Sequence, residues 1–417
     1  MPRRHTIVTS LCVLLCAGSL GIRPVAGQQE QVKGVLAEPA DATEVRKAIA
    51  NVERLLPTLP DRGAALYFLA ASKQHLGETR EALALLKECI KLKEGFDPSG
   101  GPEYSGLKGE KEFDALVDRA HHDFPAVSQA RLALVTGEKD LIPEGLAFDE
   151  RRKVFYMSSL FHRKIVEITP ESRESDFVPA EKYNLLPVLG IRPDPNDGSI
   201  WANGMDEDLG RAELLHFEAT GNLLGRFTPG GSGKHGFNDL VVRRNGEVIL
   251  TDSLSNQVFR FDPHSQTFTP LAINRPLFYP NGIALADDDR QVFVADDNGV
   301  VRIDMQNGSS ANVAPGPHNT LGGIDGLYWR KGSLLAVQNG IGSPRIALFR
   351  LSQDGLSVTE TTVLEYRSAF TREPATGAIR GNDFYFIVDT EISNLNGNHI
   401  MDVTKLEPVR IAVVHLP

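Results

Sequence analysis

Four side chains that carry carboxylate or carboxamide oxygen recur along this sequence at nearly even spacing. They are Glu144, Asn238, Asn281 and Asp325. Asn281 follows Asn238 by 43 residues and precedes Asp325 by 44, whereas Glu144 lies 94 residues before Asn238. Hard oxygen donors with two formal negative charges suit Ca²⁺, which accepts about six to eight oxygens in irregular geometry, better than Mg²⁺ or zinc. A fold that brings these four side chains together would therefore create a calcium site.

The spacing belongs to a repeat, and the repeat predicts the elements that position these side chains. Each copy starts with one opening residue, called an opener below, and continues into a short apolar run such as residues 291–296. The six openers are Glu144, Leu189, Asn238, Asn281, Asp325 and Thr376. Steps of 43 to 51 residues, with Gly, Asn and Asp turns between short strands, are typical of propeller blades. We therefore predict a mainly β fold, a six-bladed β-propeller over residues 126–417, with the openers meeting near its axis.

Two further strand-like runs predict how the propeller closes. Residues 130–135 precede the first repeat, and residues 409–414 end the chain. A propeller is stabilised when its first and last segments share a blade, so we expect these two runs to complete blade six together. Leu189 and Thr376 offer no strong ligand, which would leave one side of the cation open to water or substrate.

The motifs around four openers resemble those of one enzyme family. They are Glu144-Gly145, Phe237-Asn238-Asp239, Pro280-Asn281-Gly282 and Asp325-Gly326. In order and spacing they resemble the senescence marker protein/gluconolactonase/luciferin-regenerating enzyme family over about the last 290 residues, with paraoxonase and diisopropyl fluorophosphatase as more distant relatives. The resemblance implies a hydrolase of lactones or related esters with one catalytic divalent metal. It implies Glu144, Asn281 and Asp325 as ligands, and Asn238 as a fourth ligand or a substrate contact.

The sequence also departs from that family. Gluconolactonase-type members place an Arg two residues before the Asn of the third blade, to hold a sugar-acid lactone, and this chain has Gly236 there. Paraoxonase follows its first Glu with an Asp that helps to hold a second, structural calcium, and it uses a His in its second blade. Gly145 and, approximately, Gly204 stand at those places, while Asp239 is retained. The departures weaken the sugar-lactone assignment and put a second calcium in doubt.

Two residues are candidates for the general base of such a reaction. A bound calcium would polarise a carbonyl and stabilise the developing oxyanion. Asp325 could remove the proton of the attacking water if only one of its oxygens binds the metal. His235, three residues before Asn238, is the second candidate, and its alternative role is that of a solvated loop histidine. The four polar openers also have an alternative role, as a hydrogen-bonded ring around tunnel water.

The start of the chain predicts export. Residues 1–27 combine an arginine pair, an apolar stretch and a small-residue cleavage pattern, as a secretory signal peptide does. A membrane anchor is the alternative, but the apolar stretch is shorter than the ~18 residues of a span. Cleavage removes three arginines and takes the formal net charge from −10 to −13, which disfavours nucleic acid as a partner. We expect a periplasmic or secreted protein without a membrane span after cleavage, in which Cys89 is the one remaining cysteine and is packed rather than catalytic.

Residues 28–125, between the signal peptide and the propeller, predict a flexible leader, residues 28–41, followed by a small helical domain. The apolar period changes to that of helices from Thr43 to about His122. The segment from Gly63 onward resembles one tetratricopeptide repeat, with Gly77 at the turn before a second helix, 79–92. One and a half repeats cannot bury a solenoid core of their own. We expect this domain to dock on the propeller or on a partner.

Two hypotheses follow. The first is a periplasmic or secreted Ca²⁺-dependent hydrolase, with a small-molecule lactone or ester as substrate. The second is a non-catalytic propeller scaffold that calcium stabilises and that binds a macromolecular partner, a protein, through its helical domain. The fold alone does not decide between them, because propellers host many functions.

Overall fold

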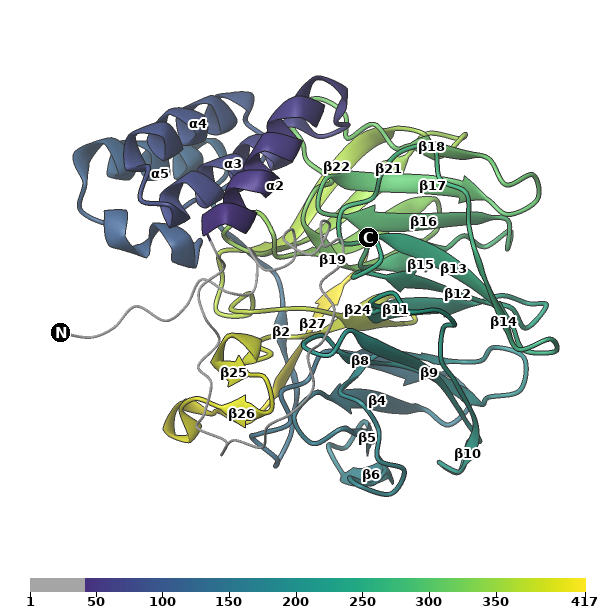
Figure 1. Ribbon diagram of the computed structural model, residues 1–417. Coiled ribbons are helices and arrows are strands. Elements are labelled where there is room, and N and C mark those ends of the chain that lie inside the picture. The colour runs from purple at the N-terminus through teal and green to yellow at the C-terminus, as the bar shows by residue number, and fades with distance from the viewer. Residues whose placement is uncertain (1–41) are drawn as a thin grey trace, which may run out of the picture.

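The computed structural model describes residues 42–417, in which a group of helices precedes a β-propeller (Figure 1). The predicted signal peptide, residues 1–27, lies outside the described residues. The helices are α2 (Ala42–Leu55), α3 (Arg62–His75), α4 (Thr79–Leu92) and α5 (Lys111–Asp123), with 3₁₀ turns at Leu56–Thr58, Pro102–Leu107, Ile392–Asn394 and Val403–Lys405. None of the helices in this described part is long and apolar enough to cross a membrane.

The prediction of a mainly β, six-bladed propeller is confirmed. Six sheets each contain four antiparallel strands that form one blade, and in the sixth sheet one of the four comes from the start of the propeller. Blades one to three are β3 (Leu146–Asp149), β4 (Val154–Ser159), β5 (Lys164–Ile168) and β6 (Glu174–Val178); β7 (Val188–Pro193), β8 (Ile200–Asp206), β9 (Arg211–Phe217) and β10 (Leu223–Phe227); and β11 (Phe237–Val242), β12 (Val248–Asp252), β13 (Gln257–Asp262) and β14 (Thr267–Pro270).

The other three blades follow the same plan. They are β15 (Ile283–Leu285), β16 (Gln291–Asp296), β17 (Gly299–Asp304) and β18 (Ser310–Asn312); β19 (Ile324–Arg330), β20 (Ser333–Gln338), β21 (Arg345–Leu351) and β22 (Val358–Tyr366); and β23 (Gly377–Arg380), β24 (Asp383–Ile387), β27 (Arg410–His415) and β2 (Arg131–Val135). The short strand β1 (Val127–Ser128) adds a fifth strand to blade five.

Blade six closes the propeller as the sequence predicts. Its outer strand, β2, pairs antiparallel with β27, and Arg131 lies opposite Val413. The two ends of the propeller are therefore hydrogen-bonded in one sheet, which removes the free edges that an open ring would have. The pairing holds the circle of blades closed, so that the six inner strands surround a common axis.

The strands bury side chains on both faces, because each blade packs between two others. In β16, Val292 and Val294 contact the core between blades three and four. The alternate side chains, Phe293 and Ala295, pack on the other side against blade five. A strand alternates its side chains between the two faces of a sheet. The nearly continuous apolar runs of this sequence thus fit strands that are covered on both sides.

Helices α3 and α4 form a hairpin with its turn at Gly77, which has a positive φ of 76°. Ala82 and Cys89 on α4 are fully buried in the core of the helical domain. Burial also raises the pKa of the Cys89 thiol well above its ordinary value, as expected for a packed cysteine. A single hairpin of this kind does not distinguish a tetratricopeptide repeat from other helical pairs, and that interpretation stays a prediction.

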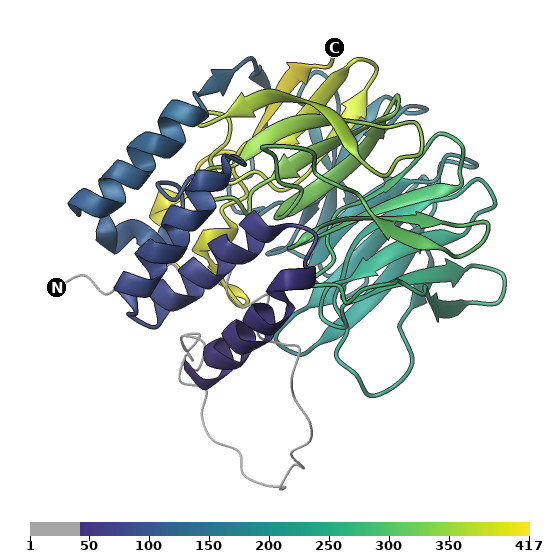
Figure 2. The same ribbon diagram turned by 90° about the horizontal axis from the view of Figure 1, so that it is seen from above.

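The helical domain packs on the propeller face where the inner strands begin (Figures 1 and 2). Asp61 caps the N-terminus of α3 through Ala64 N and is 3% exposed. Its other carboxylate oxygen accepts hydrogen bonds from the loop that precedes β19, including one of 2.9 Å from Leu321 N. Asp97 adds a second contact, because its carboxylate accepts from Ser343 Oγ at 2.7 Å on the loop after β20. The domain is thus fixed to blade five beside the opener of that blade.

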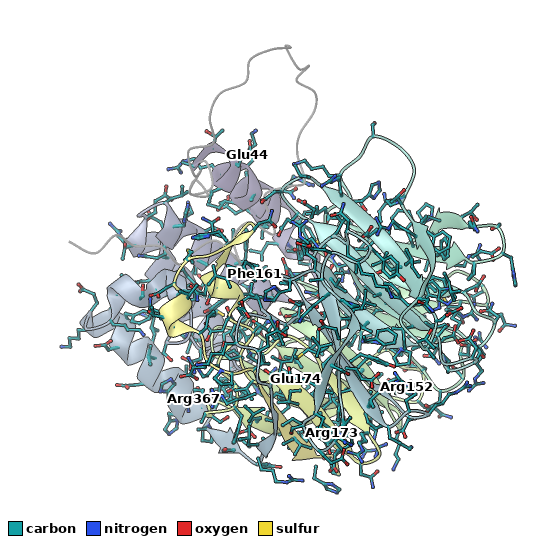
Figure 3. The ribbon with its side chains drawn as sticks, turned by 90° about the horizontal axis from the view of Figure 1, so that it is seen from below. Glu44, Arg152, Phe161, Arg173, Glu174 and Arg367 are labelled. Carbon is teal, nitrogen blue, oxygen red and sulfur yellow. The ribbon has the colours of Figure 1, made fainter. Side chains whose placement is uncertain are left out.

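A second structure lies on the same face. Between β24 and β27 the chain leaves blade six and forms a small hairpin of β25 (Leu395–Asn396) and β26 (His399–Ile400). Ile400 packs with Ile142 and Phe161 of blade one, and Figure 3 shows Phe161 beside this hairpin. Asn398 at its tip accepts a hydrogen bond of 2.6 Å from Arg163. The hairpin and the helical domain therefore both border the end of the propeller where the openers lie.

Candidate functional site

The six openers form a closed ring of contacts around the propeller axis. Glycine follows five of them, and at four of these glycines a Cβ would collide with backbone of the next blade, so that a side chain there would force the inner strands apart. Each of these four glycines faces a carbonyl oxygen of the next blade, and the distance from its Cβ position to that oxygen is 2.2 Å for Gly145 (Leu189 O), 2.6 Å for Gly190 (Asn238 O), 2.2 Å for Gly282 (Asp325 O) and 2.9 Å for Gly326 (Ala375 O).

Two threonines complete the ring where glycine does not. Thr251 Oγ1 donates to the carbonyl oxygen of Asn281 at 2.7 Å and thereby joins blade three to blade four. Thr376 Oγ1 donates to the carbonyl oxygen of Glu144 and accepts from Leu146 N at 3.1 Å, which joins blade six to blade one. Thr376 thus positions the backbone of Glu144 rather than contributing an obvious ligand.

Three of the predicted ligands present buried oxygens that have no hydrogen-bond partner among the described residues. They are Glu144 Oε2, Asn238 Oδ1 and Asn281 Oδ1. An unpaired buried polar atom costs about 1–3 kcal/mol, so three in one ring require an explanation. The amide nitrogen of Asn238 is engaged by Ser253 Oγ at 3.3 Å, which leaves its oxygen as the group that faces the ring.

Asp325, the fourth predicted ligand, is held in place by amide groups. Its Oδ2 accepts from Asn339 Nδ2 at 2.6 Å, and the side chain of Asn281 forms a second hydrogen bond to it. Burial raises the pKa of Asp325 to about 7 despite those two bonds. Burial, followed by the charges of Asp325 and Asp239, raises the pKa of Glu144 well above its ordinary value. The two ring carboxyls therefore repel one another in the absence of a cation.

The ring fits a hard divalent cation. Its donors are two carboxylates and two carboxamides, with no thiolate or imidazole among them, which is the oxygen set that alkaline-earth ions prefer. A cation there would satisfy the three unpaired oxygens and neutralise the two carboxylates. Glu144, Asn238, Asn281 and Asp325 are the residues that would hold it.

Next to the opener Asn238 lies a buried ion pair that the sequence did not reveal. Asp239, which is 2% exposed, accepts a hydrogen bond of 2.9 Å from Arg192 Nη2. The guanidinium of Arg192 also lies over the ring of Tyr328, at 5.5 Å from its centroid. The positive charge next to Asp239 is thus supplied by the protein. A second, structural calcium at Asp239 would have to compete with this guanidinium.

His235 is placed away from the openers. Its Nδ1 lies 2.6 Å from Asp252 Oδ2, and its ring packs against Phe237 and Phe259 in the core between blades two and three. Only 15% of its side chain is exposed, so the solvated loop histidine considered from the sequence is wrong. None of its contacts within the described chain is with an opener. The assignment of His235 as a general base stays a prediction without a supporting contact.

The position where the resembling family carries an arginine is closed by apolar side chains. A Cβ at Gly236 would lie 2.5 Å from Met205 Sδ and 2.6 Å from Leu254 Cγ. Met205, Leu254 and Leu189 form one buried cluster there. No room exists for an arginine at this position unless those side chains move. The wall of the site next to the Leu189 opener is therefore apolar.

A second group of possible metal ligands lies outside the ring. Glu138, Asp140 and His162 bring one ligand atom each within 4.8 Å of the others. Lys164, however, binds both oxygens of Glu138, at 2.9 and 2.8 Å, and also pairs with Asp176. An ammonium group in this position already provides the charge that a cation would bring. The group is best described as an ion-pair network that fixes the segment leading to Glu144.

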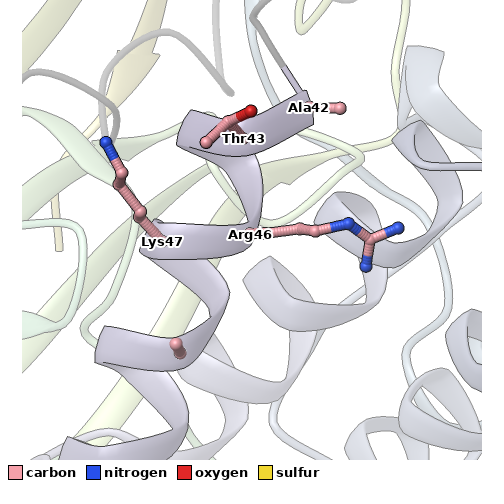
Figure 4. A pocket seen from close by; sticks show the side chains of 5 residues that line it. Ala42, Thr43, Arg46 and Lys47 are labelled. Carbon is pink, nitrogen blue, oxygen red and sulfur yellow. The ribbon is translucent and has the colours of Figure 1, made fainter.

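Two hollows in the described chain lie away from the openers. One lies on α2, where Ala42, Thr43, Arg46 and Lys47 line it (Figure 4). Another lies under the β25–β26 hairpin, with Phe161, Ile400 and Leu406 among its lining residues. Neither contains an opener.

Sequence reasoning missed Asn339, which binds the opener Asp325, and Arg192, which binds Asp239 next to the opener Asn238. Asn339 is the first residue after β20, the second strand of its blade, and the ends of second strands were not considered as part of the site. Asn203 in β8 was also missed, although both polar atoms of its buried amide lack a partner among the described residues. For Asn339 the useful signal would have been a polar residue just after the end of a second strand.

No family model and no curated protein matches this chain. Solved structures with a similar fold include a gluconolactonase from Xanthomonas campestris, with 15% identity and a TM-score of 0.47 over 70% of this chain and 98% of that one. Virginiamycin B lyase from Staphylococcus aureus gives 16% and 0.46 over 69% and 99%. Luciferin-regenerating enzyme gives 13% and 0.44 over 66% and 92%. At these identities and TM-scores the similarities assign no activity to this chain.

Proposed function

We propose that this protein is a Ca²⁺-dependent hydrolase of lactones or esters. The observation that carries the proposal is the set of three buried, unpaired oxygens, on Glu144, Asn238 and Asn281, in one ring with the desolvated carboxyl of Asp325. Calcium suits four oxygen donors and takes further oxygens from water or substrate. When bound, it would supply a Lewis acid for a carbonyl oxygen.

The residues of the chain orient the reaction. The glycine contacts fix the backbone of the openers, so that their oxygens are preorganised and need little rearrangement on binding. Asn339 and Asn281 orient the carboxylate of Asp325. The helical domain and the β25–β26 hairpin border the same end of the propeller and would shield a bound substrate from bulk water.

The walls of the site favour a substrate with an apolar part. Met205 and Leu254 fill the position at which an arginine would bind a sugar acid, so the side chains at that position are apolar. With the cation bound to Glu144 and Asp325, and with Arg192 paired with Asp239, the carboxylate of Asp297 is left beside the ring and would repel an anionic substrate. We propose neutral lactones or esters with an aliphatic or aromatic substituent. In line with the predicted signal peptide, the reaction would take place in the periplasm or outside the cell.

The test is a substrate screen on the purified protein with calcium or with chelator. Aliphatic, aromatic and sugar lactones and simple aryl esters are compared, and turnover that chelator abolishes and calcium restores supports the proposal. Asp325→Ala should abolish turnover while the far-UV circular dichroism spectrum stays unchanged. Asp287→Asn, in an exposed turn of blade four, serves as the control. Calcium binding without turnover on any substrate would instead support the scaffold hypothesis.

A further inference from the structure

The residue that follows the second strand has an equivalent place in blades three, four and five. Those strands, β12, β16 and β20, end at residues 252, 296 and 338, so that the equivalent residues are Ser253, Asp297 and Asn339. In blade three, Ser253 Oγ lies 3.3 Å from the amide nitrogen of the opener Asn238. In blade five, Asn339 Nδ2 lies 2.6 Å from Asp325 Oδ2. The position therefore reaches the ring in both neighbours of blade four.

In blade four this position holds a carboxylate that forms no ion pair within residues 42–417. Among the described residues Asp297 forms a backbone hydrogen bond, from its N to Phe278 O at 2.9 Å, and no bond to its side chain occurs. Burial, followed by the negative charges of Asp296 and Asp325, raises the pKa of Asp297 well above its ordinary value. Burial and nearby negative charges, that of Asp297 among them, also raise the pKa of the Tyr279 hydroxyl. A half-buried carboxylate thus lies close enough to Asp325 for their charges to interact.

The loop that carries Asp297 is held from both sides. The preceding carboxylate, Asp296, binds Arg275 and accepts from Phe278 N at 3.0 Å. The following residue, Asn298, donates from Nδ2 to the backbone oxygen of Asp61 in the helical domain at 3.1 Å. The carboxylate of Asp297 is therefore positioned by its neighbours although it has no partner of its own. Such a group is preorganised to accept a proton from a water molecule that attacks the substrate.

Asp325, in contrast, is poorly suited to remove a proton. Its carboxylate already accepts hydrogen bonds from Asn339 and Asn281, and it is one of the residues that would hold the cation. A general base needs a free lone pair within hydrogen-bond reach of the proton that it removes. No hydrogen bond to a described residue occupies the lone pairs of Asp297, whereas two hydrogen bonds and the cation would occupy most of those of Asp325.

We propose that Asp297 is the general base of the hydrolysis, an inference that rests on the proposed function. A carboxylate oxygen of Asp297 takes one proton from the attacking water as the water oxygen bonds to the carbonyl carbon. When the bond between that carbon and the ester oxygen breaks, the proton passes from Asp297 to the leaving alkoxide. The products are an acid and an alcohol, joined in one molecule if the substrate is a lactone, and Asp297 returns to its charged state.

The experiment compares Asp297→Asn with the wild type and with the control Asp287→Asn. Hydrolysis of δ-valerolactone and phenyl acetate is measured at saturating calcium, and calcium affinity is measured separately by titration calorimetry. We expect Asp297→Asn to lower kcat by about 100-fold or more, with KM and calcium affinity unchanged. The metal-free variant should also melt higher than the metal-free wild type at pH 8, because a buried carboxylate is removed.

The outcomes separate this inference from the proposed function. An Asp297→Asn variant that keeps wild-type kcat overturns the assignment of the base and leaves the hydrolase proposal intact. A variant that loses calcium affinity in parallel with kcat also overturns it, because Asp297 would then be a ligand. A wild-type protein that hydrolyses neither probe and nothing in the wider screen overturns the function and the base together.

Discussion

Replacing Glu144 by glutamine should stabilise the metal-free protein at high pH and abolish its response to calcium. A carboxyl whose folded pKa is raised contributes stability below its unfolded pKa and loses that contribution as the pH rises through the folded value. For Asp325 that window runs from 3.8 to about 7. At about 1.4 kcal/mol per pKa unit, the metal-free protein would lose on the order of 4 kcal/mol across it.

Glu144→Gln removes one of the two carboxyls that repel one another and also lowers the pKa of Asp325. Metal-free Glu144→Gln should therefore gain on the order of 2 kcal/mol over the wild type at pH 8 and nothing near pH 4. At about 2 °C per kcal/mol for a protein of this size, the difference in Tm would be roughly 4 °C. Calcium should raise the Tm of the wild type strongly at pH 8 and that of the variant little.

The assay is differential scanning calorimetry at pH 4, 6 and 8, with chelator or with calcium. The difference in Tm between variant and wild type isolates the ring from other groups that titrate in this range. Glu150→Gln serves as the matched control, since its exposed carboxylate pairs with Lys153 on the surface. The reasoning is refuted if metal-free Glu144→Gln melts below the wild type at pH 8, or if calcium shifts the Tm of both proteins equally.

Three further substitutions test the frame of the ring. Gly282→Ala places a Cβ 2.2 Å from the carbonyl oxygen of Asp325 and should cost about 1–3 kcal/mol in a urea titration, together with weaker calcium binding; unchanged values would refute the contact. Arg192→Met leaves the buried carboxylate of Asp239 unpaired and should cost about 3–5 kcal/mol, unless added calcium restores stability by replacing the guanidinium. Asp61→Ala removes an N-cap and the bonds to blade five, and limited proteolysis should then release the helical domain, whereas resistance like that of the wild type would contradict its role in docking.

The repeat made the fold predictable, because each blade carries its own copy of the signal. The steps between Glu144 and Thr376 gave the number of blades, and the two terminal runs gave the closure through β2 and β27. The openers could be placed near one axis from symmetry alone, since equivalent positions of equivalent blades lie at equal distance from it. Their contacts follow from the glycines, which the sequence displays beside them.

The polar contacts beside the openers could not be predicted in the same way. Arg192 and Asp239 are 47 residues apart and belong to different blades, so that their pairing depends on how far each side chain extends along the axis. The docking of the helical domain depends on Asp61, which by sequence is only the N-cap of a helix and in the structure also binds a loop some 260 residues away. Such contacts depend on the packing of whole elements, for which one sequence contains no periodic signal.

In the ring, the backbone provides rigidity and the side chains provide the affinity for a cation. Backbone contacts through glycine and threonine fix the openers whether or not a cation is present, so binding should require little ordering of the chain. The side chains do the opposite, because the carboxyls of Glu144 and Asp325 are desolvated and close enough to raise one another's energy. The free energy that a cation recovers is therefore stored in the folded protein before binding. A ring of this kind would bind calcium more tightly as the pH rises, and that gain should end once both carboxyls are ionised in the metal-free state.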